Sequence, residues 1–171
     1  FYRRAGPEGR GKLKHLPFIE IDGEPYARWW RDRFDPVNDP FLRMRFYQRG
    51  RAKVWVGTAG IANLRSTRTD AVGIHLLRIG GRFWKPTSAG IVAFGGSARA
   101  SVIDLDRHET VKFLAGEDVP LAKDDVRREV LPRGFIAVRY HGVAIGCAEW
   151  HGGEVVTSLI PKNQRIKKID L

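Results

Sequence analysis

The stretch GFIAVRYHGVAIGCAEWHGGEVVTSLIPKNQR, residues 134–165, contains the clearest folding signal in the chain. Its three runs of Val, Ile, Ala and aromatic residues are separated by short turns at 141–142 and 151–153. Glycine-containing turns between such runs are typical of antiparallel hairpins. Pro161 ends the third run, because proline has no N–H to donate to a sheet. The stretch therefore predicts a three-stranded antiparallel meander followed by a basic segment.

The composition is that of a folded protein. The chain has 171 residues, 43% of them hydrophobic, with five Trp and nine Phe, and this length fits one domain or two small ones. No apolar run approaches the roughly 18 to 20 residues of a membrane span, and no signal peptide opens the chain. We therefore expect a soluble, cytoplasmic protein with no membrane partner. The single Cys147 excludes an internal disulfide and disfavours a closed zinc site.

Charge is the strongest compositional signal. The formal net charge is +11, and both ends of the chain are cationic. Residues 28–53 hold eight basic and three acidic residues, whereas residues 104–129 hold eight acidic and five basic residues. If these segments lie on different faces, one surface attracts polyanions and another does not.

The first seventy residues divide into an arm and a small subdomain. Residues 1–14 are rich in Gly, Arg and Lys and predict a flexible basic arm. Residues 15–70 predict a small α+β subdomain, in which a strand precedes a helix with Pro25 in its first turn. The helix carries an apolar stripe that favours core packing over base stacking, formed by Tyr26, Trp29, Trp30 and Phe34.

Residues 44–57 alternate apolar and basic side chains around Gly50, which predicts a hairpin. Its basic residues form either a solvated tip or a finger that contacts phosphate, and the sequence does not decide between these two interpretations. They are Arg45, Arg49, Arg51 and Lys53. Residues 57–70 show no clear element and predict a boundary between two subdomains.

Residues 71–171 predict a second, larger subdomain. A strand covers 72–79, and Thr87 or Ser88 can cap a short helix that runs to Phe94. A further strand covers 100–105, and Asp106 with Glu109 predicts a capping box. The helix that follows runs to 115, and the acidic residues 117–129 predict a surface connection to the meander.

The chain contains few catalytic signals. It has no phosphate-binding loop, no G-x-G-x-x-G, no H-E-x-x-H and no G-x-S-x-G. Asp104, Asp106 and Glu109 could hold a metal, although a helix cap explains the last two more simply. We therefore expect no cofactor, no metal site and no enzymatic activity.

Signals for nucleic-acid binding are stronger. Cationic and aromatic residues interleave before the helix at 88–94, where Trp84 could stack a base or else belong to the core. These residues are Arg78, Arg82, Trp84 and Lys85. The basic segment after Pro161 is also suited to phosphate contact. It contributes Lys162, Arg165, Lys167 and Lys168.

Several short motifs follow one another along residues 73–166: W-K-P-T at 84–87, A-F-G-G-S-A at 93–98, V-I-D-L at 102–105 and S-L-I-P-K-N-Q-R-I at 158–166. This pattern resembles the PUA-like C-terminal RNA-binding region of Sun/fmu-type RNA cytosine-5 methyltransferases. The resemblance covers residues 72–168 and matches the first seventy only loosely. It favours an archaeal relative that stands alone, without a catalytic domain.

The resemblance implies a fold, a ligand and a set of residues. The implied fold class is α+β, with a small α/β subdomain at 15–70 and a PUA-like mixed β pseudo-barrel with short helices at 71–171. The implied ligand is RNA, and the matching residues are Lys85, Pro86, Thr87, Lys162 and Arg165. The chain lacks the Pro-Cys nucleophile and the glycine-rich S-adenosylmethionine loop of the enzymes, so it cannot perform their reaction alone.

Two hypotheses about function follow. In the first, the chain is a non-catalytic protein that binds structured ribosomal RNA or tRNA, as a ribosome-associated or maturation factor. In the second, it is the RNA-binding part of a methyltransferase whose catalytic domain lies on another chain. Under both, we expect the segments around Lys85 and Arg165 to converge on one face, away from the acidic residues 104–129.

Overall fold

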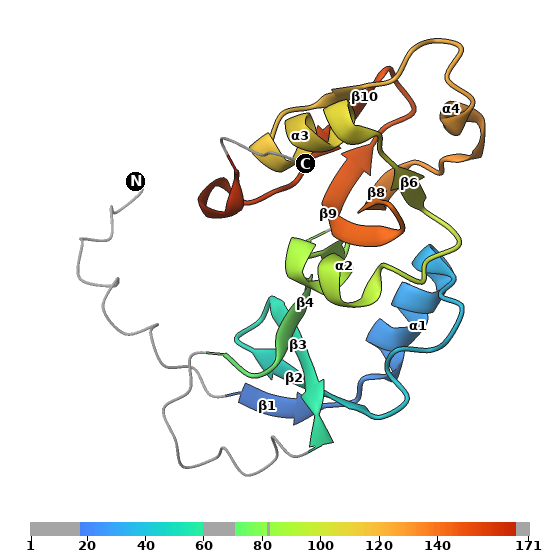
Figure 1. The fold of residues 1–171 in the computed structure, drawn as a ribbon. Coiled ribbons are helices and arrows are strands. Elements are labelled where there is room, and N and C mark those ends of the chain that lie inside the picture. The colour runs from blue at the N-terminus through green and yellow to red at the C-terminus, as the bar shows by residue number, and fades with distance from the viewer. Residues whose placement is uncertain (1–17, 60–70, 82, 167–171) are drawn as a thin grey trace, which may run out of the picture.

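The computed structural model describes residues 18–59, 71–81 and 83–166, and it contains two five-stranded sheets (Figure 1). The predicted arm at 1–14 lies outside the described residues. The N-terminal sheet has the order β1-β2-β3-β4-β5, and every neighbouring pair in it is antiparallel. Its strands are β1 (Phe18–Ile21), β2 (Met44–Arg49), β3 (Lys53–Thr58), β4 (Ile74–Arg78) and β5 (Lys85–Pro86).

The C-terminal sheet has the order β6-β8-β9-β10-β7, with β6 parallel to β8 and the other pairs antiparallel. Its strands are β6 (Val102–Asp104), β7 (Val119–Pro120), β8 (Gly134–Tyr140), β9 (Val143–Trp150) and β10 (Val155–Ser158). The helices are α1 (Glu24–Phe34), α2 (Ser88–Phe94), α3 (Arg107–Ala115), α4 (Arg127–Val130) and the 3₁₀ helix η3 (Lys162–Gln164). The predicted α+β class is confirmed. None of the helices described is long and apolar enough to cross a membrane.

The predicted meander is confirmed as β8, β9 and β10. The turn between β8 and β9 has positive φ at His141 (48°) and Gly142 (77°). Two successive positive φ values describe the tight hairpin turn whose twist matches that of the flanking strands. The predicted hairpin around Gly50 (φ 62°) is likewise formed by β2 and β3.

The predicted helix caps are also confirmed. The side-chain oxygen of Thr87 accepts a hydrogen bond from the Gly90 N–H at 2.9 Å and begins α2. Asp106 and Glu109 form both hydrogen bonds of a capping box at the start of α3. These bonds satisfy backbone N–H groups that the first turn of a helix leaves unpaired.

Strand pairing extends across the boundary expected near residue 70, because β3 and β4 are neighbours in the N-terminal sheet. The change from one sheet to the other comes after β5, so a division into 15–70 and 71–171 stays a proposal. The prediction that residues 117–129 form only a surface connection is wrong. Val119 and Leu121 are buried, and β7 pairs with β10, because an alternating apolar pair can add a short strand to an open sheet edge.

Helix α2 lies between the two sheets (Figure 1) and packs against β4 and β9. The approach to β4 is close: a Cβ on Gly90 would lie 2.9 Å from the Leu76 carbonyl oxygen, so glycine is required there. One buried cluster joins Trp30 and Phe34 of α1 to Cys147 of β9. A second, around Phe113 and Ile136, lies between α3 and the C-terminal sheet. The two halves therefore share a core.

Arg33 ties α1 to the start of β8. Its Nε donates to the Phe135 carbonyl oxygen at 2.8 Å, and its guanidinium lies over Gly134. Burial lowers the pKa of Arg33 below its ordinary value, although a guanidinium stays charged at neutral pH.

Replacing Arg33 with Met should lower the free energy of unfolding by about 1 to 3 kcal/mol, because it leaves a partly buried carbonyl without a donor. Urea unfolding monitored by tryptophan fluorescence measures the change. Arg28→Met on the same helix is the matched control, since Arg28 is exposed and has only an ion pair with Glu24 at 3.5 Å. Equal effects of the two substitutions would show that the Arg33 link contributes nothing.

Candidate nucleic-acid interface

Four cations lie in one row across the N-terminal sheet. The strand register places Arg49 opposite Lys53, Lys53 opposite Arg78, and Arg78 opposite Lys85. Residues directly opposite on paired strands share one face of the sheet, and adjacent strands are about 4.8 Å apart. The four side chains, called the cationic row from here on, therefore begin along a line of about 14 Å.

Lys53 and Arg78 of the cationic row lie on the face opposite the core. Val54 and Leu77, which alternate with them along β3 and β4, are fully buried in the core between the sheet and the helices. Lys53 and Arg78 are exposed, while Arg49 and Lys85 are half-buried. Lys53, Arg78 and Lys85 form no ion pair with any other described residue, so no described carboxylate neutralises this part of the row.

Aromatic rings lie on the same face, beside the cationic row. Trp55 stacks on His75 with centroids 4.9 Å apart, and Phe18 meets Trp55 edge-on at 5.5 Å. The Arg49 guanidinium lies 5.1 Å from the Phe18 centroid. These rings were not predicted from the sequence, although the spacing of Lys53 and Trp55 on one strand places both on one face.

His75 is uncharged at neutral pH. Burial, together with the positive charges of Arg78 and Lys53, lowers its pKa to about 4. A neutral, flat imidazole beside exposed cations is suited to stacking on a base.

The other basic residues of the hairpin have different positions. Arg45 is on β2 and pairs with Glu20 at 3.1 Å, and Arg51 is exposed in the hairpin turn. Of the four cations predicted for this hairpin, the register thus brings Arg49 and Lys53 together with Arg78 and Lys85 and leaves the other two outside the row.

The segment 84–87 has a structural role. Trp84 is half-buried against Tyr26 at 5.0 Å and Trp29 at 6.3 Å, and Pro86 is buried. The Thr87 hydroxyl donates to the His75 carbonyl oxygen besides capping α2.

This segment meets the basic segment after β10. The Ser88 hydroxyl donates to the Leu159 carbonyl oxygen at 3.4 Å, which joins the start of α2 to the residues before Lys162. Lys162 is exposed and forms no ion pair with a described residue. Arg165 turns back, donates to the Ile160 carbonyl oxygen at 3.4 Å and covers Gly116. The predicted Arg82, Lys167 and Lys168 lie outside the described residues.

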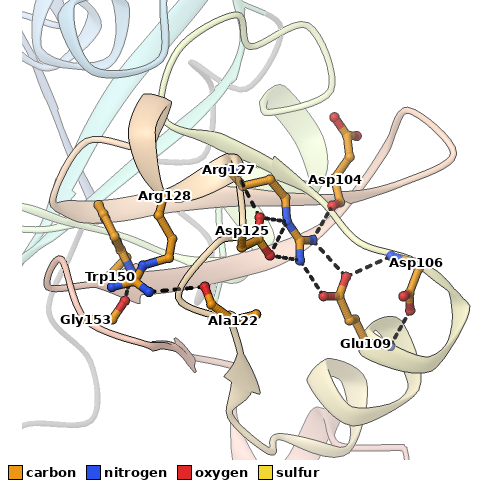
Figure 2. A network of polar contacts seen from close by, with 9 residues as sticks. All are labelled: Asp104, Asp106, Glu109, Ala122, Asp125, Arg127, Arg128, Trp150 and Gly153. Atoms are coloured by element: carbon orange, nitrogen blue, oxygen red, sulfur yellow. Dashed lines mark hydrogen bonds and ion pairs between the residues drawn. The ribbon is translucent and has the colours of Figure 1, made fainter.

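The acidic residues of the C-terminal half are engaged in a structural network (Figure 2). The Arg127 guanidinium bonds both Glu109 and Asp125 at 2.6 Å, and it donates to the Asp104 carbonyl oxygen at 3.1 Å. Hydrogen bonding to Glu109 raises the pKa of Arg127, and Arg127 lowers the pKa of Asp125. In the described part of the chain, no group of three or more His, Cys, Asp or Glu could hold a metal ion.

A hollow beside α1 is poorly suited to binding a polyanion, and the single thiol is poorly suited to nucleophilic chemistry. The hollow is lined by four carboxylates, and its two arginines, Arg31 and Arg45, are already paired. The Cys147 thiol is buried, and burial raises its pKa to about 12. A thiol with that pKa is not a nucleophile at neutral pH.

Comparison with known proteins confirms the resemblance inferred from the motifs. Residues 100–166 match the family model described as the Methyltransferase RsmF PUA domain. They contain the whole C-terminal sheet together with α3, α4 and η3. The matched model covers the PUA domain and no catalytic domain.

Two curated relatives extend the similarity over most of the chain, and both are named Ribosomal RNA small subunit methyltransferase F. The protein of Shewanella sediminis (strain HAW-EB3) is 25% identical over 167 residues, which is 94% of this chain and 32% of the relative. That of Aeromonas salmonicida (strain A449) is 26% identical over 153 residues, which is 87% of this chain and 30% of the relative. The chain thus spans about a third of the length of these relatives. An archaeal source stays a prediction.

Proposed function

We propose that this chain, whose residues 100–166 match a PUA domain, binds structured RNA and performs no catalysis itself. The cationic row is the observation that carries the proposal. Like charges placed directly opposite one another in a sheet destabilise it. Lys53, Arg78 and Lys85 are opposite one another and have no ion pair with a described carboxylate, which favours a role in binding a polyanion. Phosphate groups supply negative charge at regular intervals, which a linear array of cations can match.

The row positions RNA, and the rings beside it contact bases. Arg49, Lys53, Arg78 and Lys85 hold successive phosphates, and Lys162 adds a contact where the segment after β10 meets the start of α2. Contacts to phosphate fix the register of a nucleic acid but read no sequence. Ribosomal RNA is the preferred ligand, because the relatives are named as ribosomal RNA methyltransferases. On this proposal the protein acts in the cytoplasm, on the small ribosomal subunit or its precursors, with tRNA as a further ligand to test.

The second candidate function is the RNA-binding part of a cytosine-5 methyltransferase whose catalytic unit lies on another chain. The similarity to methyltransferases over 94% of this chain favours it. Purification of the tagged chain from cells, with and without ribonuclease, separates the two candidates. A stoichiometric methyltransferase that remains after ribonuclease supports the second, whereas small ribosomal subunits that disappear on ribonuclease treatment support the first.

The double substitution Lys53→Gln and Arg78→Gln should weaken binding to small-subunit ribosomal RNA by tenfold or more at low salt. Each charge-assisted hydrogen bond to phosphate that the substitutions remove contributes about 1.5 to 3 kcal/mol. Fluorescence anisotropy over a range of salt concentrations measures the effect. The slope of log affinity against log salt should become shallower by about 0.7 for each phosphate of single-stranded RNA that is no longer neutralised.

The matched control is Arg107→Gln with Lys123→Gln, which removes the same charge from two exposed cations of the C-terminal half. A long-range effect of net charge alone would weaken binding equally in the two double variants. That result would show that the cationic row is not the RNA-binding surface.

A further inference from the structure

Lys85, Phe135 and Glu149 form a compact group at the junction of the two sheets. The Lys85 ammonium lies 5.8 Å from the centroid of the Phe135 ring. Glu149 is directly opposite Phe135 in the β8–β9 register, so the two side chains share one face. A positive and a negative group are thus placed around one aromatic ring, at the end of the cationic row.

Lys85 and Glu149 do not form an ion pair with each other. Lys85 forms no ion pair with a described residue, and Glu149 has only a contact with His151 at 3.9 Å. The Glu149 side chain is 29% exposed, and Lys85 and Phe135 are half-buried, so solvent reaches all three.

The backbone under the group is fixed. Arg33 donates to the Phe135 carbonyl oxygen at 2.8 Å, and the β8–β9 ladder runs without a break from Gly134 to Val138. Trp84, the residue before Lys85, packs against Tyr26 and Trp29 of α1. The ring and the two charged groups are therefore presented from rigid elements, as a specific binding site requires.

We propose that Lys85, Phe135 and Glu149 form a subsite that reads one unpaired guanine base in the RNA. The Phe135 ring holds the Lys85 ammonium, which lies over it. Glu149 accepts hydrogen bonds from the N1–H and N2–H groups of guanine, and Lys85 donates to its O6. Adenine and uracil each present one N–H donor group fewer to the carboxylate along this edge, so guanine satisfies both charged side chains best.

This inference rests on the proposed RNA binding and adds base selectivity to it. The cationic row holds phosphates of any sequence, whereas the subsite distinguishes one base at the end of the row, where Lys85 belongs to both. Contacts to base edges carry sequence information that contacts to phosphate do not.

Four single-stranded RNA oligomers of equal length that differ only in one central base provide the test, with affinity measured by anisotropy at fixed salt. The wild-type chain should prefer the guanine oligomer by about tenfold, since a paired contact to a base edge discriminates by about that factor. Glu149→Gln should reduce the preference to about twofold or less and leave the affinity for the adenine oligomer unchanged. Glu129→Gln, an exposed carboxylate on α4, should keep the full preference.

The outcomes separate this inference from the proposed function. Equal, salt-dependent binding of all four oligomers overturns the guanine subsite and leaves RNA binding standing. Binding of none of them, together with no binding of ribosomal RNA, overturns both. A preference for another base, or a guanine preference that Glu149→Gln does not change, also overturns the subsite.

Discussion

Electrostatic repulsion in the cationic row is the constraint on which the account of this protein depends. Backbone hydrogen bonds fix Lys53 opposite Arg78 and Arg78 opposite Lys85, so these side chains start from neighbouring positions on the sheet. Each such pair of like charges costs about 0.2 to 1 kcal/mol. The surrounding fold supplies the compensation, since Val54, Leu76 and Leu77 bury the other face of the same strands completely. A bound polyanion would turn this unfavourable electrostatic contribution to the free energy of folding into a favourable one.

The two halves of the molecule are held together by contacts that also shape the candidate site. Helix α2 packs against both sheets, Arg33 of α1 bonds the Phe135 carbonyl oxygen, and Ser88 bonds the Leu159 carbonyl oxygen. The end of the row, at Lys85, lies against Phe135 of β8 in the C-terminal sheet. Within residues 104–129, Arg127 and the capping box of α3 engage Asp125 and Glu109. The Arg165 side chain lies against Gly116 of the same stretch, so the expectation that Arg165 lies away from residues 104–129 is wrong.

Local features were predictable from the sequence, and long-range pairing was not. Proline, glycine and capping residues mark their elements directly, which explains why the meander, the hairpin around Gly50 and the caps at Thr87 and Asp106 were predicted correctly. The pairing of β3 with β4 depends on register across residues 60–70, which no local pattern encodes. Arg49, Lys53, Arg78 and Lys85 were therefore selected as two separate groups, and Phe135 and Glu149 were not selected at all. Turn signals could not show that Val119 and Leu121 extend a sheet.

The most direct measurement of the central claim is the free energy of unfolding of the wild-type chain and of Arg78→Gln, each with and without a saturating RNA ligand. Without RNA, the substitution should stabilise the fold by about 0.5 to 2 kcal/mol, because it removes two unfavourable cross-strand pairs. With saturating RNA, the wild-type chain should be more stable than Arg78→Gln, since a ligand that binds more tightly stabilises the native state more. A substitution that destabilises the free protein, or that leaves the gain from RNA unchanged, would contradict the account.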